Sequence, residues 1–330
     1  MKKPADLSRY AILYDLPQGE YDPRQVDGIR TKTTRAGDSL EVDAYPYAQI
    51  TREAVREHMR RKTTKAMEQA NINRARRYFR QLAEANFTAE DYALHLSFDY
   101  GPIDRDHCSY EEAMRRWEAE GLPMDEDDAR RIWNNYLARV RYHMRKAGFA
   151  AEALKHLYVI EVTREPNPAD PNPLPPRFHF HLLIHAPGLD RDALEKIWGR
   201  GFAQARHLDF HDNGLEGLTA YITKQRGLER YDEDGRRFRR WGRSKNLKEP
   251  TVTVSNRKIS RRRAALVAAD VQRDGKQIFE AIYPGYRCME VKVKYSDFVA
   301  GAYIYARMRR IQTDPPRGGG GGNKTRRRRE

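Results

Sequence analysis

The segment RFHFHLLIH, residues 177–185, constrains the fold most, because apolar and polar side chains alternate along it. Residues two apart on a β-strand share a face. A strand here would turn Phe178 and Phe180 into a core and place His179 and His181 together on the opposite face. The chain has only 10 histidines in 330 residues, so this pair suggests a metal-binding strand. The alternative is two half-exposed histidines on a sheet surface.

A second alternating segment, LYVIEVT at residues 157–163, precedes the histidines across a proline-rich connector. A symmetric antiparallel pairing of the two strands places Glu161 opposite His179, on the same face. Two imidazoles and a carboxylate form a three-ligand site with open positions, which suits a divalent cation that also holds a phosphate oxygen. A pairing shifted by one residue would move Glu161 to the other face and leave His185 or His207 as the candidate third ligand.

The segment NGLEGLTAYITKQR, residues 213–226, is predicted to be a helix, with Asn213 as N-cap and Glu216 completing a capping box. Tyr221 and Lys224 are three residues apart and would share a face of this helix. A tyrosine hydroxyl, with a pKa of about 10, is a poor nucleophile unless it or its target is activated, and a bound cation supplies that activation. The alternative reading of Lys224 is a solvated helix lysine.

Lysine and arginine outnumber aspartate and glutamate by 62 to 47, a net charge of +15. This balance favours a polyanionic partner, usually nucleic acid. The segment RRFRRWGRSKNLKEP mixes cations with aromatic rings, a pattern typical of a surface that binds a DNA strand, and NRKISRRR continues it. A solvated basic loop is the alternative. The predicted DNA-binding residues are Arg236, Arg237, Arg239, Arg240, Trp241, Arg243, Lys245, Lys248, Arg261, Arg262 and Arg263.

The sequence has no apolar run long enough to cross a membrane, and its first residues carry acids and prolines where a signal peptide needs an apolar stretch. Cys108 and Cys288 are the only cysteines, which excludes a disulfide framework and a cysteine-based zinc site. We therefore expect a cytoplasmic protein with no membrane partner.

Hydrophobic periodicity predicts further helices at residues 52–83, 127–149 and 190–199, and strands at 92–100 and 202–210. Strand-like patches also occur in SLEVDAYPY, CMEVKVKYSDF and GAYIYARMRR. The helix at 127–149 should end at Gly148 and bury one apolar stripe, made of Ile132, Trp133, Tyr136, Leu137, Val140 and Met144.

The histidine pair in H-F-H, followed by Y-I-T-K at residues 221–224, resembles the HUH endonucleases, which initiate rolling-circle replication. Longer segments are similar to the rolling-circle replication-associated proteins of bacterial mobile elements and phages. They include RFHFHLLIHAPGLDRDALEKIWGRGFAQARHLDF, GLEGLTAYITK and RRWGRSKNLKEPTVTVSNRKISRRR. The resemblance extends over roughly residues 55–312.

The resemblance implies an α+β fold with a five-stranded antiparallel sheet flanked by helices, and with metal and tyrosine on one sheet face. It implies that His179 and His181 bind a divalent metal, Mg²⁺ or Mn²⁺, that Tyr221 is the nucleophile and that Lys224 assists. Glu161 as third ligand rests on the strand geometry. Tyr231 is ten residues beyond Tyr221, so we expect a single-tyrosine mechanism.

The chain would then divide into five parts. These are an N-terminal segment of unknown role (1–50), a basic helical region (51–88), the HUH endonuclease domain (89–270), C-terminal strands packed on that domain (271–312) and a disordered basic tail (313–330).

The function implied is DNA nicking and strand transfer that initiates rolling-circle replication, with a 5′-phosphotyrosine intermediate and a free 3′-hydroxyl. Expected partners are single-stranded or cruciform origin DNA, a host polymerase and, because no G-x-x-x-x-G-K-[ST] motif occurs, a host helicase. An HUH transposase or a conjugative relaxase would share this chemistry. A non-catalytic, sequence-specific DNA-binding protein is the alternative from another class.

Overall fold

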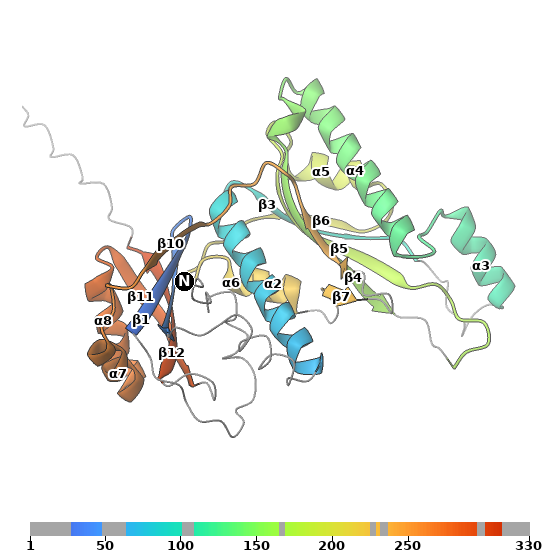
Figure 1. Cartoon of the computed structure of the whole chain (residues 1–330). Helices are drawn as coiled ribbons and strands as arrows, with labels where there is room; N and C mark the ends of the chain where they lie inside the picture. Colours follow the sequence, from blue (N-terminus) through green and yellow to red (C-terminus); the bar gives the residue numbers. More distant parts are fainter. Residues whose placement is uncertain are drawn as a thin grey trace, which may run out of the picture.

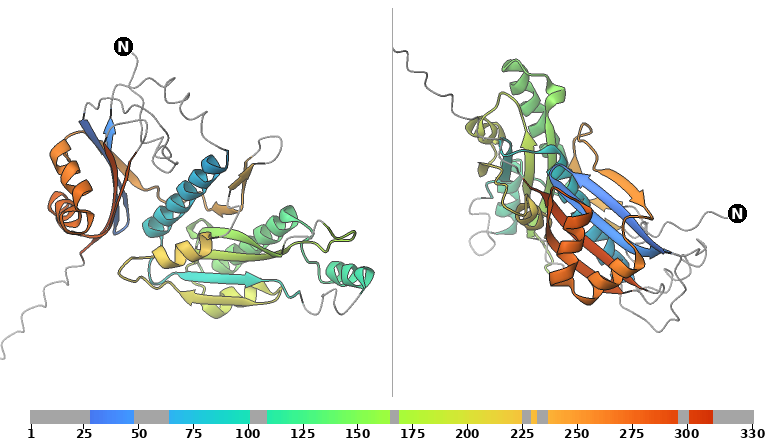
Figure 2. Two further views of the ribbon diagram at one scale, coloured as in Figure 1. Left: turned by 90° about the horizontal axis from the view of Figure 1, so that it is seen from below. Right: turned by 90° about the vertical axis from the view of Figure 1, so that its left-hand side faces the viewer.

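The computed structural model describes residues 28–47, 64–100, 109–164, 169–224, 229–231, 237–295 and 301–311. Over these ranges the fold is mixed α+β, with seven α-helices and two five-stranded antiparallel sheets (Figure 1). The long helix α2 (Thr64–Asn86) lies between the two sheets (Figure 2). The predicted tail, residues 313–330, lies outside the described residues, as do residues 1–27 and 51–63.

The first sheet, which we call the histidine sheet, carries the histidine pair on its central strand. In spatial order its strands are β6 (Ala203–His207), β3 (Tyr92–Ser97), β5 (Arg177–His185), β4 (Lys155–Arg164) and β9 (Trp241–Arg243). β4 and β5 pair in the predicted register, with Glu161 opposite His179. A bulge between Val162 and Arg164 shifts the pairing only beyond this point. Glu161 therefore lies on the face of the histidines, as predicted.

One face of the histidine sheet packs against α3 (Tyr110–Ala119), α4 (Glu126–Lys146) and α5 (Arg191–Trp198). Phe178 and Phe180 are buried here, and the Phe180 ring stacks on Trp133 with centroids 5.4 Å apart. α4 is followed by Gly148, at φ 85°, as expected. The predicted apolar stripe of α4 is confirmed, since its six residues are buried: Ile132, Trp133, Tyr136, Leu137, Val140 and Met144.

The opposite face of the histidine sheet is covered by α2 and by α6 (Glu216–Thr223). Phe79 of α2, Ile222 of α6 and Leu183 of β5 belong to the smaller core on this side. Exposure rises along β5, from 0% at Leu183 to 6% at His181, and His179 is half-buried. The histidines thus lie at the margin of this core.

The second sheet, which we call the terminal sheet, joins strands from both ends of the described chain. Its strands, in order, are β10 (Thr251–Ser255), β1 (Gly28–Ala36), β2 (Ser39–Tyr47), β12 (Ala302–Arg310) and β11 (Tyr286–Tyr295). α7 (Arg261–Ala269) and α8 (Lys276–Ile282) cover one of its faces (Figure 2) over a separate core that includes Val42, Phe279 and Ile304. A small hairpin, β7 (Glu229–Tyr231) with β8 (Arg237–Arg239), pairs apart from both sheets.

Residues 28–47, 251–295 and 301–311 therefore share one sheet and one core. The divisions that the sequence suggested at residues 50 and 270 separate these segments. The pairing of β2 with β12 sets Ala44 opposite Ile304. Because these segments are far apart in sequence, no local pattern predicts that they pair.

Two local predictions also differ from the structure. α6 begins with Leu215 at its N-cap and no capping side chain, so the predicted capping box of Asn213 and Glu216 is wrong. Glu216 instead forms ion pairs, described below. α3 occurs within a stretch that reads only as polar and acidic, and its N-cap Ser109 accepts a hydrogen bond from the amide of Glu112.

Candidate functional site

The sheet register brings the three predicted metal ligands together. Glu161 of β4 faces His179 across the hairpin, and His181 Nε2 donates a hydrogen bond to Glu161 Oε2 at 2.6 Å. His181 is nearly buried, whereas Glu161 and His179 are half-buried. Two imidazoles and one carboxylate therefore form a compact cluster at the margin of the α2–α6 core.

A fourth member of this cluster, His95 of β3, was missed by sequence reasoning. His95 is paired with His181 in the register of β3 and β5, and their rings stack with centroids 4.7 Å apart. Its Nε2 atom lies 3.1 Å from Nδ1 of His179. The only available signal was a histidine between Leu94 and Leu96 in an alternating strand, which does not reveal the strand that lies beside it.

The cluster is electrostatically arranged to offer neutral imidazoles and a charged carboxylate. Burial lowers the pKa of His95 to about 4, and the neighbouring His181 and His179 contribute to this shift. Burial also lowers the pKa of His179. The hydrogen bond from His181 lowers the pKa of Glu161. At neutral pH these groups carry the lone pairs that a cation requires.

The chemistry of this donor set suits a divalent cation. Imidazole nitrogens with a carboxylate oxygen bind divalent transition metals, and carboxylates also bind Mg²⁺ and Mn²⁺. Within the described ranges, no group of three or more His, Cys, Asp or Glu side chains is arranged to hold a metal ion as it stands. The ligand atoms are instead hydrogen-bonded to side chains, His179 to His95 and Ser97, and His181 to Glu161. These are contacts that a cation would replace.

Tyr221 of α6 lies directly beside the histidine cluster. Its ring is 53% exposed and stands perpendicular to the ring of His181, with centroids 5.8 Å apart. Lys224 extends over the Tyr221 ring, its Nζ atom 4.2 Å from the centroid. The predicted common side of Tyr221 and Lys224 is therefore confirmed. The arrangement places an accessible hydroxyl and a cation next to the candidate metal ligands.

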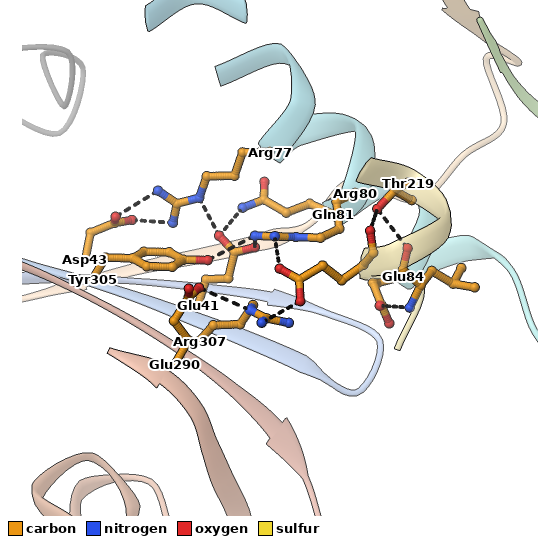
Figure 3. A network of polar contacts seen from close by, with 12 residues as sticks. Glu41, Asp43, Arg77, Arg80, Gln81, Glu84, Thr219, Glu290, Tyr305 and Arg307 are labelled. Atoms are coloured by element: carbon orange, nitrogen blue, oxygen red, sulfur yellow. Dashed lines mark hydrogen bonds and ion pairs between the residues drawn. The ribbon is translucent and has the colours of Figure 1, made fainter. Parts of the chain in front are cut away.

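Both ends of α6 are held by arginines from outside the helix. At its C-terminal end, Arg76 of α2 donates to the backbone carbonyls of Thr223 and Lys224, at 2.7 and 2.9 Å. At its first turn, Glu216 is bound by Arg80 of α2, at 3.3 Å, and by Arg307 of β12, at 2.6 Å (Figure 3). A helix of eight residues is marginal in isolation, so these contacts fix where Tyr221 stands.

The same network ties α2 to the terminal sheet (Figure 3). Arg77 binds Asp43 through two nitrogens, at 2.8 and 2.7 Å, and also binds Glu41. Arg80 binds the second oxygen of Glu41 at 2.7 Å. Burial alone would raise the pKa of Glu41, but Arg77 and Arg80 lower it to about 2. The terminal sheet is thus linked through α2 to the helix that carries Tyr221.

The residues predicted to bind DNA are not gathered on one surface. Trp241 is buried and packs edge-on against Tyr78 and Phe79, which removes it from base stacking. Arg240 is also buried and forms an ion pair with Glu126 at 3.2 Å. This segment is basic in sequence, but Arg240 and Trp241, where β9 begins, are buried at the edge of the histidine sheet.

The remaining predicted DNA contacts are spread over two regions. Arg243 is half-buried and paired with Glu249, at 2.6 Å, while Lys245 and Lys248 are exposed nearby. Arg261, Arg262 and Arg263 are exposed on α7, which covers the far face of the terminal sheet (Figure 2). Arg236 and the side chains of Arg237, Arg239 and Tyr231 lie outside the described part of the chain.

The two alternative third ligands have other contacts. Nδ1 of His185 lies 2.6 Å from Oδ1 of Asp91, at the far end of β5 from the cluster. The ring of His207 stacks on Tyr92, with centroids 4.5 Å apart. Of the three candidates for the third ligand, Glu161 is the one that lies beside His179 and His181, as the sequence predicts.

Comparisons with protein-family models, with curated proteins and with solved structures found no significant match to this chain. None of the helices within the described residues is long and apolar enough to span a membrane.

Proposed function

We propose that the protein is a metal-dependent, single-tyrosine DNA-nicking and strand-transfer enzyme of the HUH type, which initiates rolling-circle replication. The observation that carries this proposal is the contact of Tyr221 with His181, on the sheet face that also holds His179 and Glu161. A histidine pair alone is compatible with a structural role. An exposed tyrosine and a lysine placed against that pair are what nucleophilic attack on a phosphodiester needs.

In this proposal His179, His181 and Glu161 hold a divalent cation, Mg²⁺ or Mn²⁺, with His95 packed against both histidines. When bound, the cation supplies a positive charge that neutralises and orients the scissile phosphate. Before the cation binds, the hydrogen bond to Glu161 keeps the imidazole of His181 turned toward the site.

Tyr221 is the nucleophile of the proposed reaction. Its Oη atom bonds to phosphorus and its proton passes to solvent, while the bond from phosphorus to the 3′ oxygen breaks and that oxygen takes up a proton. The products are a 5′-phosphotyrosine and a free 3′-hydroxyl. One phosphodiester replaces another, so the step needs no ATP and can be reversed by a new 3′-hydroxyl. The ammonium group of Lys224 offsets negative charge at the phosphate.

The substrate would be single-stranded or cruciform origin DNA in the cytoplasm, with a host helicase and a host polymerase acting on the nicked product. A transposase or a relaxase would carry out the same covalent step at other DNA ends. A non-catalytic DNA-binding protein would bind the same strand without forming the covalent link, and this difference makes the proposal testable.

The test uses overlapping single-stranded oligonucleotides tiled across the DNA element that encodes the chain, incubated with the protein and Mn²⁺. We expect a covalent protein–DNA adduct that survives denaturing electrophoresis, and we expect Tyr221→Phe to abolish it while leaving the fold intact. Tyr142→Phe is the matched control, because Tyr142 is equally exposed, at 52% against 53%, but lies on α4. An adduct that forms normally with the Tyr221→Phe variant would refute the assignment.

A further inference from the structure

A groove of about 510 Å³ lies between α2, α6 and the terminal sheet. Side chains alternate along β11 and β12, so Val291, Val293 and Ile304 face the core under α7 and α8. Lys292 and Lys294 therefore line the groove from the opposite face of β11. The groove thus belongs to the junction between the two sheets and is separate from the histidine cluster.

The groove wall is strongly basic. Arg74 and Arg76 of α2, Lys224 at the end of α6, and Lys292 and Lys294 of β11 all line it. Arg74, Lys224 and Lys292 are exposed.

Seven arginines and lysines line the groove against two carboxylates, and both carboxylates are paired with cations. Glu216 is bound by Arg80 and Arg307, and Glu290 is bound by Lys292, at 2.6 Å, and by Arg307, at 3.7 Å. The surface contact between Lys292 and Glu290 is weak and exchangeable. The wall therefore presents an excess of positive charge to an incoming anion.

One end of the groove adjoins the candidate nucleophile. Thr223 and Lys224 line it, and Nζ of Lys224 lies 4.2 Å from the centroid of the Tyr221 ring. A chain of phosphates that has one member at Tyr221 can therefore continue into the groove past Lys224. The opposite wall, on β11, supplies further cations along the same path.

We propose that this groove binds single-stranded DNA, holding the nucleotides next to the phosphate that Tyr221 attacks. This inference rests on the proposed function. The groove volume suits a short stretch of one strand and is far too small to enclose a duplex. The tyrosine hydroxyls in its wall are engaged, since Tyr305 accepts from Arg80 and Tyr303 donates to Asp43. The charged groups of the wall are mainly cations, so the contacts proposed are with phosphates and binding is independent of sequence.

The experiment measures binding of fluorescent oligothymidylate in EDTA, where no cleavage can occur, over a series of salt concentrations. The test protein carries Arg74→Gln, Lys292→Gln and Lys294→Gln together, at positions distant from the histidine cluster. We expect the affinity at low salt to fall by about tenfold or more. The slope of log K against log salt concentration should become shallower by about 2, because each lost phosphate contact of a single strand removes about 0.7. Arg74→Gln alone, on exposed helix surface, should lower the slope by about 0.7.

The matched control replaces Arg261, Arg262 and Arg263 of α7 with glutamine, which removes the same charge from the far face of the terminal sheet. Binding by this variant should match that of the unaltered protein. Unchanged binding by the groove variant, a larger loss in the α7 variant, or equal competition by inorganic phosphate or duplex DNA would overturn the inference. Because the assay needs no covalent step, it reports on the groove separately from the adduct assay on Tyr221. Loss of the adduct with groove-dependent binding retained would refute the proposed chemistry alone.

Discussion

The two five-stranded sheets differ in how deeply their polar side chains are buried and in how these side chains are paired. On the terminal sheet, Glu41 and Asp43 are 1% and 4% exposed, and arginines from α2 bind both carboxylates. On the histidine sheet, Glu161 and His179 remain half-buried, and Tyr221 is mostly exposed. The first set is buried and bound by arginines. The second is partly open to solvent.

This difference separates polar groups that hold the fold from polar groups that are available for chemistry. Removing one partner from a buried ionic network leaves charges that the protein interior cannot solvate. When a half-exposed side chain is removed, water can solvate the polar groups that it had contacted. Substitutions on the terminal sheet should therefore lower stability, and substitutions on the histidine face should lower activity while the fold remains.

The largest effect is expected from Glu41→Ala, which removes the buried carboxylate that Arg77 and Arg80 share. We expect the free energy of unfolding to fall by about 3–5 kcal/mol, measured by urea denaturation. Glu112→Ala is the control, because the exposed ion pair of Glu112 with Arg116 on α3 should contribute less than about 1 kcal/mol. A loss below about 1 kcal/mol for Glu41→Ala would mean that the network does not hold the sheets together.

The pH dependence of stability should show the same buried group. The pKa of Glu41 is about 2 in the folded protein, against an ordinary value of 4.5. A depressed carboxyl pKa stabilises the fold above pH 4.5, and this stabilisation is lost as pH falls toward 2. The loss attributable to Glu41 is about 3–4 kcal/mol, at about 1.4 kcal/mol for each unit of the pKa shift. Urea midpoints measured across this window should depend on pH less steeply in Glu41→Gln, and equal slopes would contradict the assignment.

A smaller effect, confined to activity, is expected from Glu161→Gln on the histidine face. The substitution keeps the shape of the side chain but removes the charge, so the divalent-metal concentration for half-maximal cleavage should rise about 10- to 100-fold. Unfolding by urea should be nearly unchanged, in contrast to Glu41→Gln. A stability loss as large as that of the Glu41 variant would place Glu161 in the structural class and remove the contrast between the two sheets.

The sequence alone predicted those features of the fold that depend on residues close together in the chain. The alternation of β4 and β5 gave the register that sets Glu161 opposite His179, and the helical period gave the buried face of α4. Both depend on residues close together in the chain, where side-chain periodicity leaves few alternatives.

Long-range pairings were not accessible in this way. Arg77 and Arg80 read as part of a basic helical region, because their partner Glu41 lies on a strand of the other sheet. Trp241 read as a DNA contact for the same reason, since its neighbours in sequence are cations while its neighbours in space are Tyr78 and Phe79. His95 became part of the site only through the strand that lies beside it.

The central claim is that the open face of the histidine sheet forms a covalent bond to DNA through Tyr221. The most direct measurement digests the adduct formed in Mn²⁺ with nuclease and protease and locates the nucleotide-bearing peptide by mass spectrometry. We predict a single modified peptide that contains Tyr221, carrying a 5′-linked nucleotide. A modified peptide that contains Tyr231 or another tyrosine in place of Tyr221, or the absence of any covalent peptide from DNA that is cleaved, would contradict the account.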